Sequence, residues 1–173
     1  MSDDKKRKKE ERGKKSGDPM FSDELCPLHG TLRITVRDAK TNKIEKEYVF
    51  DNLVMTFLRL RISHLFAGNF QPDAAANESY ITQLQVGTSG VAEDASDAAI
   101  TNPVTITPLA VTYPSSNSVQ FEGILASGSG NGITFREAGL VFGNPASLAT
   151  RRVFPPMEKS SLWIWEINWL LYF

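Results

Sequence analysis

Residues 162–173 (LWIWEINWLLYF) constrain the fold of this 173-residue chain more than any other stretch. Side chains along a strand point alternately to its two faces. One face would carry six large apolar residues, namely Trp163, Trp165, Ile167, Trp169, Leu171 and Phe173, and the other would carry four more around Glu166 and Asn168. A strand that is apolar on both faces is expected at the centre of a β-sandwich or beneath a neighbouring subunit. We therefore expect Trp163, Trp165, Trp169 and Phe173 to form core or a subunit interface, with the core favoured for the tryptophans.

Other segments show the same period of two. Apolar and polar residues alternate over 31–37, turn-forming residues follow at 38–43, and 44–50 can return as the second strand of a hairpin. Further strands are expected at 80–86, 104–111, 119–126 and 133–142.

Two connecting segments complete the predicted domain. Residues 53–66, preceded by the capping candidates Asp51 and Asn52, have the apolar pattern of a largely buried helix. The glycine-rich segment 128–132 lacks the lysine of a phosphate-binding loop, and it is expected to be a hairpin turn with positive φ angles. The prediction is a mainly β protein, in which residues 31–173 form a single antiparallel β-sandwich domain with one short helix.

The first 30 residues differ from this domain in composition. Residues 1–18 hold eight basic and five acidic residues, a net charge of +3, whereas the remainder of the chain has a net charge of −4. Residues 2–17 contain no large apolar side chain, so they are expected to be disordered unless a partner protein orders them. We predict an extended charged arm and linker over 1–30, which binds its partner through Lys5, Lys6, Arg7, Lys8, Lys9, Arg12, Lys14, Lys15 and Phe21.

The basic run in this arm permits a second interpretation. Dense positive charge also suits phosphate neutralisation, so nucleic-acid binding is an alternative, which the interspersed acidic residues and the lack of interleaved aromatic residues disfavour. No apolar segment follows the basic residues as in an export signal, and none is long enough to span a membrane. The sequence thus predicts a soluble, unexported protein with no membrane partner, and its single cysteine, Cys26, fits a reducing compartment.

Few residues of the chain are candidates for metal ligands or catalytic histidines. Cys26 and His29 have the spacing of half a zinc site, but His64 is the one remaining histidine and a tetrahedral site needs about four ligands. A buried thiol and a surface imidazole are the expected alternative. No metal, cofactor or catalytic histidine is predicted.

Three carboxylates on predicted strands, Glu122, Glu137 and Glu166, raise the question of a two-carboxylate mechanism. Such residues more often pair with arginines or face solvent, and Arg136, Arg151 and Arg152 are the available partners. The sequence therefore predicts a protein that is not an enzyme.

Four stretches together resemble virion structural proteins of tailed bacteriophages. They are LRITVRDAKTNKIEKEYVFDNLV (32–54), ITQLQVGTSGVAEDASDAAITNPV (81–104), ITFREAGLVFG (133–143) and RRVFPPMEKSSLWIWEINWLLYF (151–173). The chain departs from the family pattern where Ser89 interrupts an expected GTG step, and where Arg59 and Arg61 lie on the predicted helix. The arm lies outside the resemblance.

The resemblance implies a non-enzymatic component of a phage particle, assembled as repeated copies with other virion proteins in the tail, neck, fibre or baseplate. Its expected location is the virion, assembled in the host cytoplasm. A capsid decoration or head-fibre protein is the first alternative. A receptor- or carbohydrate-binding module is another, although Tyr113 is the one aromatic residue in the predicted loops.

Overall fold

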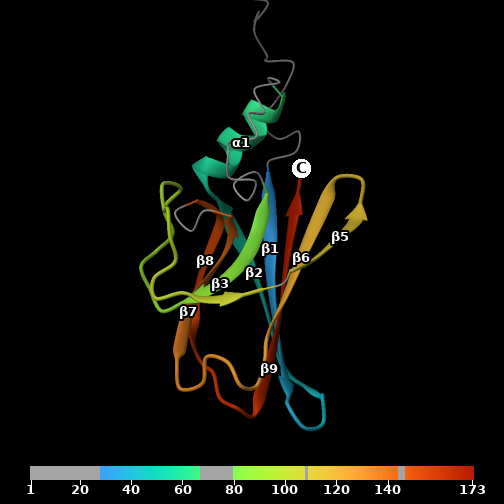
Figure 1. Cartoon of the computed structure of the whole chain (residues 1–173), viewed down its shortest axis with the longest axis vertical. Helices are drawn as coiled ribbons and strands as arrows, with labels where there is room; N and C mark the ends of the chain where they lie inside the picture. Colours follow the sequence, from blue (N-terminus) through green and yellow to red (C-terminus); the bar gives the residue numbers. More distant parts are fainter. Residues whose placement is uncertain (1–27, 67–79, 108, 144–146) are drawn as a thin grey trace, which may run out of the picture.

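A computed structural model of the chain describes residues 28–66, 80–107, 109–143 and 147–173. Nine strands and one helix follow in the order β1 (His29–Asp38), β2 (Ile44–Val54), α1 (Thr56–Phe66), β3 (Ile81–Gly87), β4 (Val104–Ile106), β5 (Ala110–Ser115), β6 (Ser118–Leu125), β7 (Thr134–Phe142), β8 (Leu148–Glu158) and β9 (Trp163–Tyr172) (Figure 1). The predicted mainly β, antiparallel character with one short helix is confirmed.

All nine strands belong to one sheet, in the order β4-β3-β7-β8-β2-β1-β9-β6-β5, and every neighbouring pair is antiparallel. Consecutive strands form the hairpins β1–β2, β5–β6 and β7–β8. The late strand β9 lies between β1 and β6, and it pairs with both along most of its length.

The sheet curls into a half-barrel, and its two halves are joined at one narrow point. β2 pairs with β8 only through Leu53 with Arg151 and Val54 with Thr150. On the other side of the half-barrel β4 lies close to β6. A Cβ atom added to Gly123 of β6 would lie 2.9 Å from Cγ2 of Ile106 of β4. The predicted two-sheet sandwich is not confirmed, because one continuous sheet bends round the core instead.

The inward face of β9 supplies the two largest fully buried side chains of this core, Trp165 and Trp169. Trp165, Ile167, Trp169 and Leu171 are each at most 1% exposed. The ring of Trp165 packs edge-on against Phe135 of β7, with 5.6 Å between ring centroids, so the two halves of the sheet meet here. Burial of each such side chain contributes about 1.5–3 kcal/mol.

Two turns have the chemistry expected from their residues. Asp38 Oδ1 accepts hydrogen bonds from the backbone N–H groups of Lys40 and Thr41 and from the Thr41 hydroxyl. These bonds, led by the one from the Thr41 backbone, lower the pKa of Asp38. In the segment 128–132, Gly130 and Gly132 have φ angles of 69° and 78°, as predicted. The predicted hairpin is wrong, because β6 and β7, which this segment joins, are not neighbours in the sheet.

Several element boundaries differ from the sequence prediction. β1 begins two residues before Thr31, and β2 continues to Val54, so the helix starts at Thr56. The predicted strand over 104–111 is two strands, β4 and β5, that lie at opposite ends of the sheet. β8 was not predicted at all.

The burial of two elements also differs from the prediction. α1 is not largely buried: its Leu58 is 6% exposed, but its Leu60 is 48% exposed. The outward face of β9, with Leu170 and Tyr172, is partly exposed rather than covered. Within the described residues, no helix is long and apolar enough to cross a membrane.

Candidate functional site

A cluster of hydrogen-bonded and charged groups joins the long β3–β4 connection, residues 88–103, to the sheet. Glu137 of β7 is fully buried, and its Oε2 accepts a hydrogen bond of 2.8 Å from Arg151 Nε of β8. Its Oε1 accepts two backbone N–H groups of the connection, from Ser89 at 3.1 Å and from Thr101 at 2.8 Å. One carboxylate therefore fixes both ends of this connection.

Arg151 holds the middle of the same connection. Its Nη1 donates to Asp97 Oδ2 at 2.6 Å, and its Nη2 donates to the carbonyl oxygen of Val91 at 3.1 Å. Burial of the guanidinium lowers its pKa, but the hydrogen bonds to Glu137 and Asp97 outweigh that effect, so the pKa of Arg151 is raised. An arginine held this way stays charged and takes no part in proton transfer. The arrangement is structural, and we call it the Glu137–Arg151 network.

The network contains residues from three of the four stretches singled out in the sequence, 81–104, 133–143 and 151–173. The GTSG step supplies the Ser89 N–H group, the EAGL strand supplies Glu137, and the RRVF segment supplies Arg151. Ser89, which interrupts the expected GTG step, donates its backbone N–H group to Glu137, so this bond does not depend on the Ser89 side chain. Gly139 is required by space, because a Cβ atom there would lie 2.8 Å from the backbone oxygen of Thr150.

The three carboxylates considered from the sequence are widely distributed over the fold. Glu137 is buried in the network, whereas Glu166 lies on the outer face of β9 and pairs with Arg37 Nε at 2.8 Å. Glu122 lies on the outer face of β6, opposite Asn168. Glu137 therefore forms the expected type of ion pair, with Arg151.

Histidine and metal chemistry have little support in the part of the chain that the structure describes. His29 stacks on Tyr172, with ring centroids 4.8 Å apart, and His64 is exposed on α1. Cys26 lies outside the described residues. Among those that are described, no group of three or more His, Cys, Asp or Glu residues could hold a metal ion.

Lys159 is an unusual titratable group at the β8–β9 turn. Its side chain is fully buried, and Nζ donates to the carbonyl oxygen of Ser160 at 2.9 Å and to Asn131 Oδ1 at 3.4 Å. Neither partner is charged, and burial lowers the pKa of Lys159. The lysine cross-links the β8–β9 and β6–β7 turns at the lower end of the fold.

A polar groove of about 350 Å³ runs over the outer face of β9, between β1 and β6. It is lined by Thr31, Arg33, Gln120, Asn168, Leu170 and Tyr172. Gln120 Nε2 donates to Asn168 Oδ1 at 3.1 Å, which orients both amides. The stacked rings of His29 and Tyr172 lie at one end. Amides, a guanidinium and an aromatic ring together suit a ligand that carries several hydroxyl groups.

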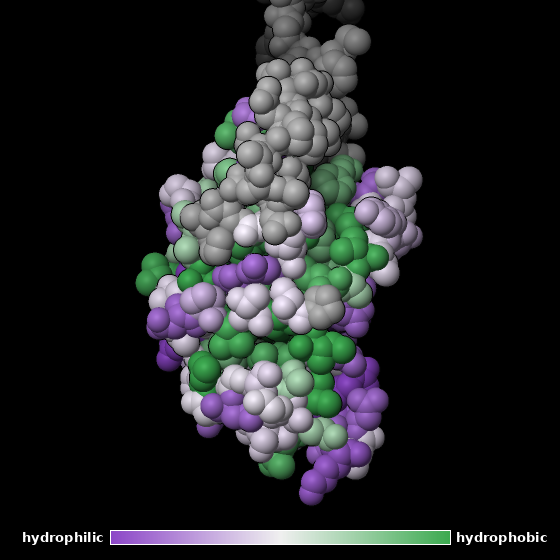
Figure 2. Space-filling model, viewed as in Figure 1, coloured by the Kyte–Doolittle hydropathy of each residue, from purple (hydrophilic) through white to green (hydrophobic). Residues whose placement is uncertain are grey.

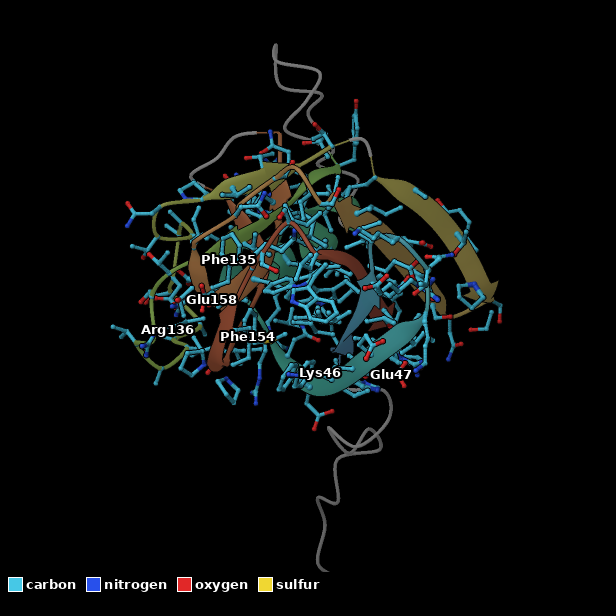
Figure 3. All side chains as sticks on the ribbon, turned by 90° about the horizontal axis from the view of Figure 1, so that it is seen from below. Lys46, Glu47, Phe135, Arg136, Phe154 and Glu158 are labelled. Atoms are coloured by element: carbon cyan, nitrogen blue, oxygen red, sulfur yellow. The ribbon has the colours of Figure 1, made fainter. Side chains whose placement is uncertain are left out.

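A second hollow, of about 420 Å³, lies where β2 and β8 separate below their two paired residues. Val36, Tyr48, Met157, Trp163 and Trp165 form its apolar part, and Glu45, Lys46, Glu158 and Ser160 are among its polar residues. Seen from below in Figure 3, Phe154 and Glu158 lie on the β8 side and Lys46 and Glu47 on the β2 side. We call this hollow the β2–β8 cleft.

On the face that Figure 2 shows, apolar residues gather across the middle, and strongly polar residues lie at the β1–β2 turn (purple, lower right).

Of the residues expected in the core or an interface, Trp165 and Trp169 are buried in the core. Trp163 is partly buried at the β2–β8 cleft, and Phe173 is 46% exposed. The arm candidates, from Lys5 to Phe21, lie outside the described residues.

Sequence reasoning missed the polar groove, although its signal was present. Thr31 and Arg33 alternate with apolar residues on β1, as Asn168 does on β9, so each points outward. What was missing is the strand order, which alone brings Gln120 of β6 beside Asn168.

The fold and these sites define a small antiparallel β protein in which the Glu137–Arg151 network has a structural role. No family model, curated protein or solved structure matches this chain.

Proposed function

We propose that this protein is a non-enzymatic structural component of a tailed-bacteriophage particle. It belongs to the tail, neck, fibre or baseplate, and it assembles as repeated copies through its charged arm and its β domain. The observation that carries the proposal is the Glu137–Arg151 network. Residues from three of the four phage-like stretches meet in it, and they hold a long surface connection rather than a reactive group.

The burial of these groups supports a structural role for the motifs. Glu137 is fully buried, and Arg151 is 4% exposed, so a substrate in solution has no access to the carboxylate. Removal of one partner from such a pair costs several kcal/mol, so the motif residues act to keep one shape. A fixed surface is what a protein that repeats in an assembly needs.

The test is the presence of the chain in purified particles. A tagged full-length chain is expressed during infection, particles are purified on a density gradient, and heads are separated from tails before immunoblotting. We expect the chain in the tail fraction. Its presence in heads alone would favour the capsid-decoration alternative, and its absence from particles would overturn the proposal.

A shortened chain tests the role of the arm. A chain that begins at Leu28 retains all of β1, which starts at His29, and it is expected to fold but not to enter particles. Circular dichroism and urea unfolding check its folding. Normal incorporation of this shortened chain would contradict the role of the arm, and a salt-dependent gel shift with residues 1–30 tests the nucleic-acid alternative.

The polar groove favours a second candidate function, carbohydrate binding. Asn168 and Gln120 present oriented amides beside Tyr172, which matches the needs of a sugar. In glycan-array and calorimetric measurements, Asn168→Ala is expected to weaken binding roughly fivefold through loss of a hydrogen bond of about 1 kcal/mol. Asn117→Ala, in the β5–β6 turn outside the groove, is the matched control, and equal effects of the two changes would contradict this site.

A further inference from the structure

The β2–β8 cleft lies at one end of the fold, and the charged arm joins the domain at the other end. The cleft is formed by the end of β1 at Val36, the start of β2, the end of β8 and the start of β9. The arm precedes Leu28 and therefore joins the chain where β1 begins, at His29. In Figure 1 β1 begins near α1, and the β1–β2 turn lies at the far end. At about 3.3 Å per residue, Val36 is about 23 Å from His29.

The β2–β8 cleft combines aromatic rings with exposed carboxylates. Tyr48 and Trp163 are partly exposed in its lining, and Trp165 is 1% exposed. Glu45 and Glu158 are exposed at its rim, and Glu158 forms no ion pair within the described residues. A lysine or arginine has an apolar stem and a cationic tip, so it can pack against the rings and pair with a carboxylate at the rim. The cleft therefore suits basic side chains.

The strands beside the cleft disfavour an occupant that pairs with them as an added strand. Pro155 and Pro156 of β8 have no N–H group to donate. Glu45, Lys46 and Glu47 are exposed at the start of β2, and charged residues of this kind keep a strand edge free. The occupant is therefore recognised mainly by its side chains.

The arm is the segment of this chain whose chemistry matches the cleft. Residues 1–18 have a net charge of +3, whereas the remainder of the chain has a net charge of −4. The arm carries Glu10 and Glu11 between two basic groups, Lys5–Lys9 and Arg12–Lys15. The rim of the cleft likewise carries one cation, Lys46, beside its carboxylates. Opposite charges can therefore pair in both directions between the arm and the rim.

We propose that the β2–β8 cleft of one copy binds basic residues 5–15 of the arm of the next copy, so that copies join head to tail. The end of one copy that carries the arm then meets the end of the next that carries the cleft. Residues 16–27, which connect the basic residues to the domain, span at most about 40 Å and so can cross between two copies. An arm that entered its own cleft would have to reverse direction at Leu28 and run back along β1.

This inference deepens the proposed function by naming the binding site of the arm, and it rests on that proposal only for its biological setting. A head-to-tail contact uses two different surfaces, so it repeats from copy to copy and closes into a ring or continues as a filament. Figure 3 views the molecule from the end that carries the cleft, where Glu158 lies on the β8 side and Lys46 on the β2 side. These two residues are where a change of charge should affect the contact between copies.

The first test measures self-association of the full-length chain in solution. Sedimentation velocity over a range of chain concentrations at low salt is expected to show association that weakens as salt is added. Glu158→Lys is expected to weaken it about fivefold, because it replaces an attraction with a repulsion. Asp51→Lys makes the same change of charge at an exposed residue of β2 outside the cleft, and as the matched control it is expected to leave association unchanged. Urea unfolding checks that both variants are folded.

A cysteine cross-link tests which surfaces meet. In a Cys26→Ser background, one chain carries Ser16→Cys in the arm, and a second chain with a tag of different mass carries Ser160→Cys in the cleft. A mixture of the two in a glutathione redox buffer is expected to form the disulfide-linked heterodimer. Ser116→Cys, at an exposed residue of the β5–β6 turn, replaces Ser160→Cys in the control and is expected to form far less.

The opposite results would overturn the head-to-tail contact. A chain that is monomeric at every concentration excludes it, even if that chain enters particles. Equal effects of Glu158→Lys and Asp51→Lys, or equal cross-linking at residues 116 and 160, place the arm outside the cleft. A double variant with Ser16→Cys and Ser160→Cys that closes its disulfide within one chain places the arm in its own cleft. Absence of the chain from particles would instead overturn the proposed function and leave these solution results unchanged.

Discussion

Removing the positive charge of the Glu137–Arg151 network tests whether these groups hold the β3–β4 connection. In Arg151→Met, the buried carboxylate of Glu137 keeps its two backbone donors, Ser89 and Thr101, but loses its counter-charge. Breaking one side of a buried ion pair costs about 3–5 kcal/mol. Since the two backbone bonds remain, we expect the lower end, a loss of about 3 kcal/mol in the free energy of unfolding.

This loss is a large part of the about 5–15 kcal/mol that stabilises a typical domain, and urea unfolding measures it directly. Arg136→Met is the matched control, because Arg136 is the exposed neighbour of Glu137 on β7, and it should change stability by less than about 0.5 kcal/mol.

Hydrogen exchange supplies a local measurement of the same effect. The amides of Ser89 and Thr101 donate to Glu137, so their protection is expected to fall in Arg151→Met well beyond the fall at β9. The double variant Arg151→Met with Glu137→Gln should lose less than the sum of the single losses, because the two residues interact. If Arg151→Met is no more harmful than Arg136→Met, or if exchange over residues 88–103 is unchanged, the network does not hold the connection.

Three further changes address packing and charge, each read out by urea unfolding. Trp165→Ala should cost about 3–5 kcal/mol, whereas Leu162→Ala, at a residue 57% exposed, should cost less than about 0.5 kcal/mol; similar losses would place Trp165 outside the core. Gly139→Ala should cost about 1–3 kcal/mol because its Cβ meets β8 backbone, while Gly128→Ala meets no atom within 4 Å and should be tolerated. Lys159 has a pKa below its ordinary value of 10.5, so the folded chain holds fewer protons than the unfolded chain between the two values, and stability should rise with pH there. Lys159→Met should remove that rise, and an unchanged pH profile would contradict the assignment.

The hairpin and the strands around residues 31–37, 119–126, 133–142 and 162–173 could be predicted because their alternation is local. β8 could not, because its sequence LATRRVFPPME interrupts the apolar pattern with arginines and prolines. Arg151 is tolerated inside the sheet because Glu137, which is distant in the sequence, neutralises it, and the prolines lie at a register shift. The sequence of β8 is thus compatible with a strand only because of its pairing with β7, and rules based on local sequence cannot predict that pairing.

The curl of the sheet could not be predicted from the sequence either. Period-two alternation identifies which residues share a face, but not which strand lies beside which. The split of residues 104–111 into β4 and β5 depends on the curl of the sheet, which brings β4 at one end of the strand order close to β6 near the other end. The polar groove follows from that order.

The position of β9 also has a consequence for how the chain is made. β9 lies between β1 and β6, yet the ribosome synthesises it after every other strand that the structure describes. Until residues 163–172 emerge, β1 and β6 have no common partner, and the tryptophan-rich centre of the core is missing. Contacts between such distant parts of a chain form slowly. Folding of this half of the sheet is therefore expected to follow translation, and a chain that ends before β9 should lack the core that holds β1 and β6 together.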